Sequence, residues 1–582
     1  METPTRSGLL GALVAREFDL LVIGGGITGC AIARDAALRG IPVALVEKDD
    51  FGSGTSSRSS RLIHGGVRYL EYGQLRLVFE ASAERRLLLR LAPHLVRPLE
   101  FVWPVYKGAR IPRWKLAAGL TLYDWLALFR NIDRHHRLSP REVVAVEPAL
   151  RSEGLLGGAR YYDAATDDAR LTLANAIGAI RAGAALANHT AATRLDMRSG
   201  AGAVVSVREM LDRQEFDVRA KVVVNAAGPW SDDVRALERS DAAAAVHSGA
   251  AVHGSKGSHI AVPRVRLPTH DAVTLISPID GRVLFALPAG ELTIVGTTDH
   301  YTRQSADTVC ASEREVAYLL EAANYFFPGR ALGRDDVVAA WAGIRPLAVT
   351  KQSSVTASRE HSIATSPSGV VTVTGGKLTT ARRMAADVVD HALEHLGRPV
   401  RRTPTANTPL PGGDLESVAR AESEATAVLG DPALARHLVA AHGSAWRVVA
   451  GDIQRGDDGG QRLHPAFPYT LGEVRYSIRS ELACTLGDIL IRRTRLAFET
   501  PDHAGSAVPR VARTMATLLG WSDARRQAEM TAFDEEIRRI FSIEASQPSD
   551  DATPAGLAPG ATPFRESSSA RPPRDSAPPP AT

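Results

Sequence analysis

The sequence predicts an α/β fold that ends in a helical region, and three observations support this prediction. Residues 18–50 follow the pattern of a strand, a glycine-rich turn, a helix and a second strand. Residues 273–299 contain three β-rich runs separated by an Asp-Gly and an Ala-Gly turn, both typical of hairpins. Residues 415–543 carry mainly helical patterns. We therefore expect a nucleotide-binding α/β unit, an antiparallel sheet and a helical domain in one chain.

The first of these segments has the parts of a site for a dinucleotide pyrophosphate. Its turn is Gly-x-Gly-x-x-Gly, followed by a helix expected over 27–39 and a second strand that ends at Glu47. The first glycine permits the tight turn, the second lets the phosphates approach the backbone, and the third lets helix and strand pack closely. The helix N-terminus offers free N–H groups to the anion. Glu47 would accept hydrogen bonds from the ribose hydroxyls and would repel a 2′-phosphate. The residues assigned here are Gly24, Gly26, Ile27, Thr28, Gly29, Glu47 and Lys48. The alternative is a glycine-rich turn in another kind of α/β protein.

The residues that follow favour FAD over NAD as the dinucleotide. A typical NAD domain continues with further βα units, whereas residues 51–73 are dense in Gly, Ser, Thr and Arg. Such a segment is expected to form a loop around an extended cofactor, with hydroxyls near the phosphates and a His-Gly-Gly near the reactive end. Residues 221–234 and 369–393 add two more strands that enter glycine-containing turns, the second followed by an amphipathic helix. Segments distributed in this way suit a large flavin nucleotide. The further residues assigned to the cofactor are Thr55, Ser56, Ser57, Ser60, Leu62, His64, Gly65, Gly66, Ala227, Gly228, Trp230, Gly343, Gly376, Lys377, Leu378 and Thr379.

Composition and charge restrict the class of function. The 582 residues are 44% hydrophobic and 23% charged, and the net charge of +4 is small for this length. No block of like charge has interleaved aromatics, so nucleic acid is not expected as a partner. The 3 cysteines lie far apart without metal-ligand spacing, which predicts a reducing compartment, no disulfide framework and no metal site. The apolar run over 8–14 is too short for a membrane span and leaves no room for a cleavage site, so the protein is expected to stay inside the cell.

The chain contains, in this order, the motifs TSSRSSRLIHGGVRYLE, DDARL, NAAGPW, KGSHI, GTTD, GIRPL, GGKLTT and DILIRRTRL. Through these motifs it resembles, from residue 18 to about residue 521, the FAD-dependent, quinone-linked glycerol-3-phosphate dehydrogenase family. Arg58 and Arg61 depart from the family pattern, which has a small residue and a lysine there, and the tail beyond Ser542 has no counterpart. The resemblance implies oxidation of sn-glycerol 3-phosphate to dihydroxyacetone phosphate, with hydride transfer from C2 of the substrate to N5 of FAD.

The resemblance also implies the type and order of the domains. It implies a Rossmann-like FAD-binding domain of the glutathione-reductase or amino-acid-oxidase type, interleaved with an antiparallel-sheet substrate domain and followed by a helical domain. The expected divisions are an N-terminal extension over 1–16, the interleaved domains over 17–400 with the substrate sheet mainly in 80–160 and 240–345, a linker over 401–414, the helical domain over 415–544 and a disordered tail over 545–582. Within the helical domain, helices are expected over 481–498 and 510–519.

A phosphoester of a secondary alcohol requires cations for the phosphate and an acceptor for the hydroxyl proton. We assign Arg345, Arg359 and Lys377 as the cations, because each lies at a strand end or in a turn and guanidinium matches two phosphate oxygens. The resemblance places Arg345 close to the substrate carbon skeleton and the flavin, so it is also placed among the catalytic residues. The resemblance further implies substrate contacts by Arg68 and Tyr69, and His259 and Thr298 are also assigned to the substrate site.

For the proton, His64 is the first candidate, since imidazole has an ordinary pKa of about 6.5 and the loop places it near the reactive end of the cofactor. Asp299 and His259 are the alternative bases. In a further alternative, His64 only hydrogen-bonds the flavin.

The family mostly passes its electrons to membrane quinone, which implies a peripheral protein on the inner, cytoplasmic face of the cell membrane. Residues 110–137 are apolar and aromatic with basic ends, which suits an interfacial helix drawn to anionic lipid; a helix buried against the substrate sheet is the alternative.

Two other functions remain as alternatives: an oxidase that makes hydrogen peroxide from oxygen, and a non-catalytic flavin-binding redox module. The chain lacks the insertion expected of the oxidases, and its several cations favour phosphate over the amino acid of a flavin amine oxidase. A homodimer is a further hypothesis.

Overall fold

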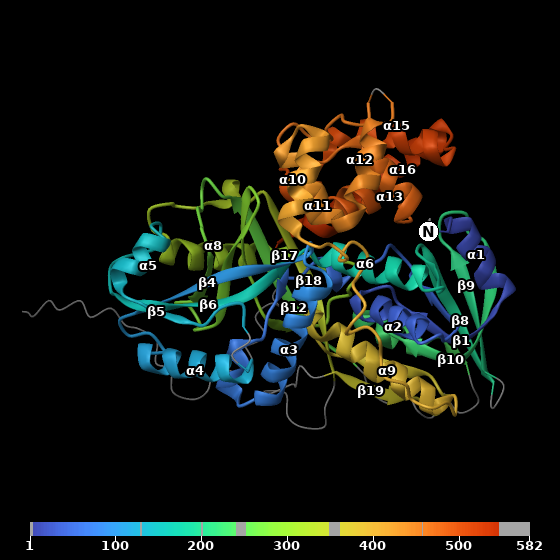
Figure 1. The fold of residues 1–582 in the computed structure, drawn as a ribbon, viewed down its shortest axis with the longest axis horizontal. Helices are drawn as coiled ribbons and strands as arrows, with labels where there is room; N and C mark the ends of the chain where they lie inside the picture. Colours follow the sequence, from blue (N-terminus) through green and yellow to red (C-terminus); the bar gives the residue numbers. More distant parts are fainter. Residues whose placement is uncertain are drawn as a thin grey trace, which may run out of the picture.

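The computed structural model describes residues 4–128, 131–198, 202–239, 252–348, 361–456 and 458–545. Two large sheets lie side by side, and the C-terminal helices α10–α16 cover the region where the sheets meet (Figure 1). The chain crosses between the sheets several times, so that each sheet contains strands from distant parts of the sequence. The interleaved α/β fold class predicted from the sequence is confirmed.

The first sheet is 9-stranded, in the order β11-β8-β9-β10-β1-β2-β7, with β20 on β10 and β19 on β20. Its central strands β7, β2, β1, β10 and β20 are parallel. The apolar run 20–23 of β1 is buried on both of its faces, as expected for a central parallel strand. The strands are β1 Glu17–Ile23, β2 Val43–Val46, β7 Ala185–Ala187, β8 Thr190–Arg198, β9 Gly202–Glu209, β10 Glu215–Asn225, β11 Glu238–Arg239, β19 Ser362–Thr365 and β20 Val371–Thr374.

Helices α2 (Ile27–Leu38), α6 (Asp168–Arg181) and α9 (Ala381–His395) pack together on one face of this sheet. Helix α1 (Arg6–Ala15) lies at the opposite side, near the N-terminus in Figure 1, and buries Leu13 among strand residues. The predicted first strand, glycine turn and helix are confirmed, and the second strand ends one residue before Glu47.

The second sheet is 10-stranded, in the order β16-β12-β15-β14-β13-β4-β6-β3, with β18 on β12 and β5 on β6. The predicted hairpins β13–β14 and β14–β15 are present, and their turn glycines Gly281 and Gly290 have φ of 72° and 62°. The strands are β3 Leu62–Ile63, β4 Val96–Tyr106, β5 His136–Leu138, β6 Leu155–Thr166, β12 Val252–Pro263, β13 Ala272–Ile276, β14 Val283–Ala289, β15 Leu292–Gly296, β16 His300–Thr302 and β18 Ala339–Ala348. The helices of this region are α3 Leu75–Leu91, α4 Arg113–Leu126, α5 Pro140–Val146 and α8 Glu313–Phe326, whereas the short α7 Ser231–Arg235 packs against the first sheet.

The C-terminal region is helical and shares a core with the second sheet. Phe498 makes a T-shaped contact with Trp341 of β18, with ring centroids 5.2 Å apart. Its last strand, β21 (Ile543–Glu544), pairs with β17 (Ala311–Ser312) next to α8. The helices are α10 Val418–Leu429, α11 Pro432–His442, α12 Trp446–Gln454, α13 Leu471–Ser480, the π-helix Asp488–Arg493, α14 Leu496–Glu499, α15 Val508–Leu519 and α16 Asp523–Phe541.

The continuous helix expected over 481–498 is wrong. Leu482 has a left-handed φ of 57°, and the carboxylate of Asp488 accepts the backbone N–H groups of Cys484 and Thr485. The chain therefore becomes helical only from Leu486 and continues as a π-helix over Asp488–Arg493. The helix expected over 510–519 is confirmed, within α15.

Helix α4, within residues 110–137, has one buried face and one exposed face. Its inner face buries Leu116, Leu120 and Tyr123 in the core of the second sheet. On its outer face, Trp114 and Trp125 are 74% and 61% exposed. Among the residues that the structure describes, no helix has the length and apolar character needed to cross a membrane. The predicted tail beyond residue 545 lies outside the described residues.

Candidate functional site

A cavity of about 570 Å³ extends between the two sheets. At one end it is lined by Glu47, Lys48 and Trp230, and at the other by Arg345 and Lys377. Its volume lies in the range of about 300–1,000 Å³ that is usual for ligand and cofactor sites. The cavity thus connects the glycine-rich turn of β1 with the cations of the second sheet.

The glycine-rich turn leaves its backbone open to a ligand. Gly24 has φ of 109°, and a Cβ atom there would lie 2.7 Å from the carbonyl oxygen of Ala226. A Cβ on Gly29 would lie 1.9 Å from the carbonyl oxygen of Gly24, so this glycine permits the close contact of α2 with β1. At Gly26 a Cβ would meet only the hydroxyl of Ser56, at 3.3 Å, and would project into the cavity wall. Gly26 therefore keeps the N-terminus of α2 accessible to phosphates, which fits a pyrophosphate.

Glu47, the residue expected to bind the adenosine ribose, lines the cavity. Its carboxylate accepts the backbone N–H groups of Gly25 and Asp49, at 2.5 and 2.9 Å. Burial raises the pKa of Glu47 to about 7, and the charge of Asp49 acts in the same direction. Next to it, the ammonium of Lys48 pairs with Asp307 at 2.6 Å and lies 4.3 Å from the ring centre of Trp230.

The raised pKa predicts that FAD affinity depends on pH. Ribose hydroxyls donate best to the ionised carboxylate, which is present above a pKa of about 7 and is lost as the pH falls through it. For one such group, FAD should bind about tenfold more weakly at about pH 6 than at about pH 8. Titration of the FAD-free protein measures this, and Glu47→Gln should bind with no such slope. A wild-type affinity that stays constant over this range would contradict the assignment.

At the other end of the cavity, Arg345 of β18 lies across β12. A Cβ on Gly257 would lie 2.4 Å from Nη2 of Arg345, so the glycine of KGSHI makes room for the guanidinium. Nη2 donates to Oγ1 of Thr297 at 3.0 Å, and Nη1 lies 3.3 Å from the carboxylate of Asp299. Lys377, in the turn after β20, places its ammonium 3.6 Å from the ring centre of Tyr69. Two cationic side chains therefore converge on the same end of the cavity.

The two candidate histidines differ in their surroundings. His64 lines the cavity, and its backbone N–H donates to Oγ1 of Thr379 at 3.2 Å. His259 stacks on Trp341 with ring centroids 5.3 Å apart, and its Nε2 lies 2.8 Å from Oγ of Ser60. Burial lowers the pKa of His259 to about 3, together with the charges of Arg345 and Arg61. His259 is therefore a weak base, because its protonated form is destabilised, and this disfavours it as the proton acceptor.

Most of the residues assigned from the sequence line this one cavity. They are Gly24, Gly26, Ile27, Thr28, Glu47, Lys48, Thr55, Ser56, Ser60, Leu62, His64, Gly66, Tyr69, Ala227, Gly228, Trp230, His259, Asp299, Gly343, Arg345, Gly376, Lys377, Leu378 and Thr379. Arg359 and the side chain of Arg68 lie outside the described part of the chain.

Four assigned residues lie behind the cavity wall. Gly29 is covered by the turn of Gly24. Ser57 is buried, with its hydroxyl toward the carbonyl of Gly54. Gly65 packs against Tyr123. Thr298 donates its hydroxyl to Glu315 at 3.1 Å instead of pointing toward a substrate.

The cavity also contains residues that the sequence did not single out. Thr190, Ala191 and Ala192 of β8 line it, as does Asp307, which accepts hydrogen bonds from Lys48 and from the indole of Trp230 at 3.1 Å. These residues belong to an ordinary strand and an ordinary loop. Only the folding of distant segments brings them to the end of the cavity that contains Glu47, so no local pattern marks them.

The family comparisons agree with this geometry. Residues 19–382 match the family model described as FAD dependent oxidoreductase, and residues 403–526 match the model described as C-terminal domain of alpha-glycerophosphate oxidase. The fold and the site thus define an FAD-dependent oxidoreductase, with FAD as its cofactor.

Individual relatives show to which family of FAD-dependent oxidoreductases the chain belongs. The chain is 39% identical over 562 residues to a mitochondrial glycerol-3-phosphate dehydrogenase of Macaca fascicularis, covering 91% of this chain and 74% of that protein. It is 36% identical over 538 residues to a glycerol-3-phosphate dehydrogenase of Synechocystis sp., covering 90% of this chain and 96% of that protein. The crystal structure of glycerol-3-phosphate dehydrogenase from Bacillus halodurans complexed with FAD matches with a TM-score of 0.77 and 30% identity, over 93% of this chain and 100% of that one. The chain belongs to the FAD-dependent glycerol-3-phosphate dehydrogenase family.

Proposed function

We propose that this protein oxidises sn-glycerol 3-phosphate to dihydroxyacetone phosphate and passes the electrons to a membrane quinone. The observation that carries the proposal is the convergence of Arg345 and Lys377 in the cavity that also contains the FAD-binding turn. A dianionic substrate needs such a pair of cations, and the relatives of this chain are glycerol-3-phosphate dehydrogenases.

Each residue at this end of the cavity has a distinct role. Arg345, held by Thr297 and Asp299, binds the phosphate or the substrate oxygen, and Lys377 adds the second positive charge. His64 accepts the proton of the C2 hydroxyl, and Asp299 is the alternative acceptor. Bound FAD supplies the acceptor for the hydride that leaves C2. The protein residues thus bind and orient the substrate and remove its proton.

An assay of the substrate tests the first half of the proposal. Glycerol 3-phosphate should be oxidised, whereas glycerol and small amino acids should give only background rates, because they do not engage both cations. Equal rates with glycerol and glycerol 3-phosphate would contradict the role of the cations.

The surface next to the reactive end supports a membrane acceptor. Large apolar side chains of α3 and α4 are exposed there, and we define the α3–α4 surface by Leu75, Phe79, Trp114, Trp125 and Leu128. Both helices contact the short helix Val67–Tyr72, which carries Tyr69 into the cavity. In Figure 1 they lie along the lower edge, opposite the C-terminal helices. Arg113 and Lys115 are exposed beside Trp114 and would attract anionic lipid. We therefore place the protein on the cytoplasmic face of the membrane, bound reversibly.

Oxygen is the alternative acceptor. The match of residues 403–526 to the C-terminal domain of alpha-glycerophosphate oxidase keeps this function open. Parallel assays with glycerol 3-phosphate separate the two: one follows reduction of a quinone analogue, and the other follows hydrogen peroxide in air. We expect rapid quinone reduction and little peroxide. The opposite ratio would identify an oxidase.

The α3–α4 surface makes a testable prediction about membrane binding. The double change of Trp114 and Trp125 to serine should weaken binding to vesicles with anionic lipid by about tenfold or more, because two interfacial aromatic anchors are lost. Dehydrogenase activity with a water-soluble acceptor should stay unchanged. Val265→Ser, at a position that is 81% exposed elsewhere, is the matched control and should bind vesicles as the wild type does. Unchanged vesicle binding of the double variant would rule out this surface.

A further inference from the structure

The motif DILIRRTRL, which begins at Asp488, has no part in the reaction described so far. It lies in the C-terminal helical region, yet its arginines point toward the FAD-binding part of the chain. Arg492, Arg493 and Arg495 are each only 4% exposed, and none of them lines the cavity. All three form ion pairs with carboxylates outside the C-terminal region.

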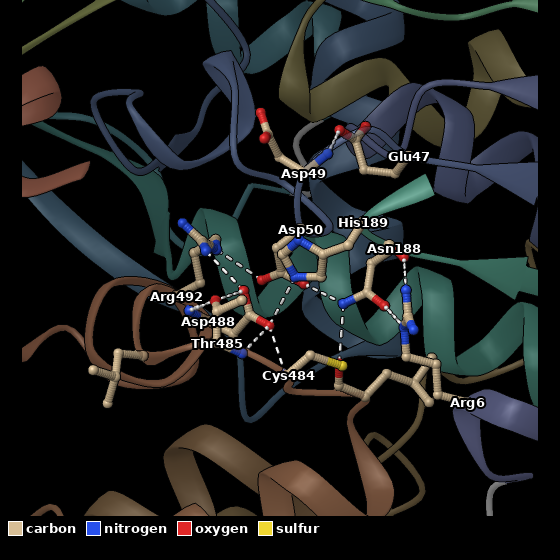
Figure 2. Close-up of polar contacts among 12 residues, drawn as sticks. Arg6, Glu47, Asp49, Asp50, Asn188, His189, Cys484, Thr485, Asp488 and Arg492 are labelled. Carbon is tan, nitrogen blue, oxygen red and sulfur yellow. Dashed lines mark hydrogen bonds and ion pairs between the residues drawn. The ribbon is translucent and has the colours of Figure 1, made fainter. Parts of the chain in front are cut away.

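Two of the arginines hold Asp50, which follows Glu47 by three residues. Nε of Arg492 lies 2.7 Å from one oxygen of Asp50, and Nη2 of Arg493 lies 3.0 Å from the other. Asn188 donates to the same carboxylate at 3.0 Å. Figure 2 shows Asp50 between Arg492 and Asn188, with Glu47 and Asp49 on the strand end above it. The carboxylate of Asp50 is completely buried, so its position is fixed by these donors.

The backbone of the same segment is held from the other side. The carbonyl of Glu47 accepts the N–H of Thr190 at 2.7 Å, and the carbonyl of Asp49 accepts the N–H of His189 at 2.6 Å. The ring of His189 in turn lies 3.1 Å from Asp488, which Arg492 also contacts at 2.9 Å (Figure 2). The ribose-binding end of β2 is thus connected to the C-terminal region through buried charges.

This cluster is an internal ion-pair network. Ligand atoms of Asp50, His189 and Asp488 lie within 4.8 Å of one another, a spacing that a metal ion could use. However, guanidinium groups of Arg492 and Arg493 contact the carboxylates directly. They supply the positive charge that a metal would otherwise provide, so the cluster gives no reason to expect a metal.

The third arginine, Arg495, holds residues 57–59, which lie further along the loop that follows Glu47. Nη2 of Arg495 lies 2.8 Å from Asp167 and forms a second ion pair with Asp168. Asp168 accepts both the backbone N–H and the hydroxyl of Ser59, at 3.1 and 2.6 Å. Nη1 of Arg495 also lies 3.5 Å from the carbonyl of Ser57. The segment 57–59 is therefore positioned by the same motif that holds Asp50.

We propose that Arg492, Arg493 and Arg495 act as an arginine clamp that holds the cofactor loop 47–60 in its FAD-binding conformation. The C-terminal region then sets the affinity for FAD, although none of its described residues lines the cavity. The arginines are positioning residues, and the inference rests on FAD binding alone. A protein that binds FAD but does not oxidise glycerol 3-phosphate would contradict the proposed function and leave the clamp fully testable.

The test compares FAD affinity among full-length variants. Arg493→Gln and Arg495→Gln should raise the Kd for FAD about tenfold or more. The first removes one of the two arginines that pair with the buried Asp50, and the second removes the arginine that pairs with the buried Asp168, so the loop is no longer held in place. Arg462→Gln is the matched control: Arg462 pairs with Asp431 inside the C-terminal region, so its loss should leave the Kd within about twofold. At saturating FAD, the KM for glycerol 3-phosphate should stay at the wild-type value in all three.

A second pair of variants and a second measurement protect the test against misfolding. Arg493→Lys and Arg495→Lys keep the charge but lose the forked geometry, and we expect intermediate FAD affinities. Hydrogen exchange of the FAD-free proteins should show faster exchange within 47–60 in the Gln variants, with α9 unchanged. If folded Arg493→Gln or Arg495→Gln binds FAD as tightly as the wild type does, the arginine clamp is ruled out. So would equal losses of FAD affinity in these variants and in the Arg462 control.

Discussion

Arg345→Ala is expected to lower kcat/KM for glycerol 3-phosphate by about 10²–10³-fold, which corresponds to about 2.7–4 kcal/mol of transition-state stabilisation. The guanidinium lies at the end of the cavity opposite the FAD turn and is oriented by Thr297 and Asp299. Alanine removes its charge and both of its forked donors from the substrate. The variant should remain yellow, because Arg345 does not contact the part of the cavity that binds the nucleotide.

The measurement is the steady-state rate, together with the flavin content of the purified variant. Arg266→Ala is a matched control in the same sheet region: Arg266 forms an exposed ion pair with Asp336 away from the cavity, so its loss should change kcat/KM less than about twofold. Near-normal turnover in Arg345→Ala would remove this residue from the site. Loss of flavin from it would mean that the arginine acts on cofactor binding instead.

Gly26→Ala is expected to weaken FAD binding by about tenfold to hundredfold, or about 1.4–2.8 kcal/mol. The added methyl group would lie 3.3 Å from Oγ of Ser56 and would occupy the approach of the pyrophosphate to the N-terminus of α2. Because its φ of −71° is accessible to alanine, the fold should survive the change. Titration of the FAD-free variant gives the affinity, and thermal unfolding without FAD reports on the fold.

Substitutions of two other glycines serve as comparisons for this prediction. Gly11→Ala, on α1 with nothing within 4 Å of the new Cβ, should leave FAD affinity unchanged. Gly29→Ala places a Cβ 1.9 Å from the carbonyl of Gly24 and should destabilise the FAD-free protein itself. FAD affinity of Gly26→Ala equal to that of the wild type would show that the phosphates do not approach the chain at this turn.

The parts of the fold that could be predicted from the sequence are those determined by short segments. The strand, turn and helix over 18–50 are continuous in the chain, and each glycine there has a local steric reason. The hairpins of the second sheet follow from Gly281 and Gly290 in the same way. For Arg345 and Lys377, the resemblance to a family supplied what local patterns could not, because the two residues come from different sheets.

Long-range contacts and the direction of individual side chains could not be predicted from the sequence. Ser57 and Ser56 are neighbours in one short helical turn, yet only Ser56 faces the cavity, and no periodicity distinguishes them. The expected helix over 481–498 failed because Asp488 caps a new start after the left-handed Leu482. That break orients the arginines toward Asp50, a residue more than four hundred positions earlier.

Helix α4 shows why a single interpretation of an apolar segment can be incomplete. Residues 110–137 suggested either a membrane-facing or a buried helix. One face of α4 is buried, and for its exposed opposite face membrane contact stays a proposal. Tyr123 is fixed inside by Asp163 at 2.8 Å, while Trp114 and Trp125 stay on the surface. Composition alone does not separate the faces, because both contain large apolar side chains.

Anaerobic addition of glycerol 3-phosphate to the purified holoprotein tests the central claim most directly, namely that the cations and the FAD turn serve one reaction in one cavity. We predict that the visible absorbance of the bound flavin is bleached by one equivalent of glycerol 3-phosphate, that glycerol leaves it unchanged, and that a quinone analogue restores it. A flavin that stays oxidised in the presence of excess glycerol 3-phosphate would contradict this account.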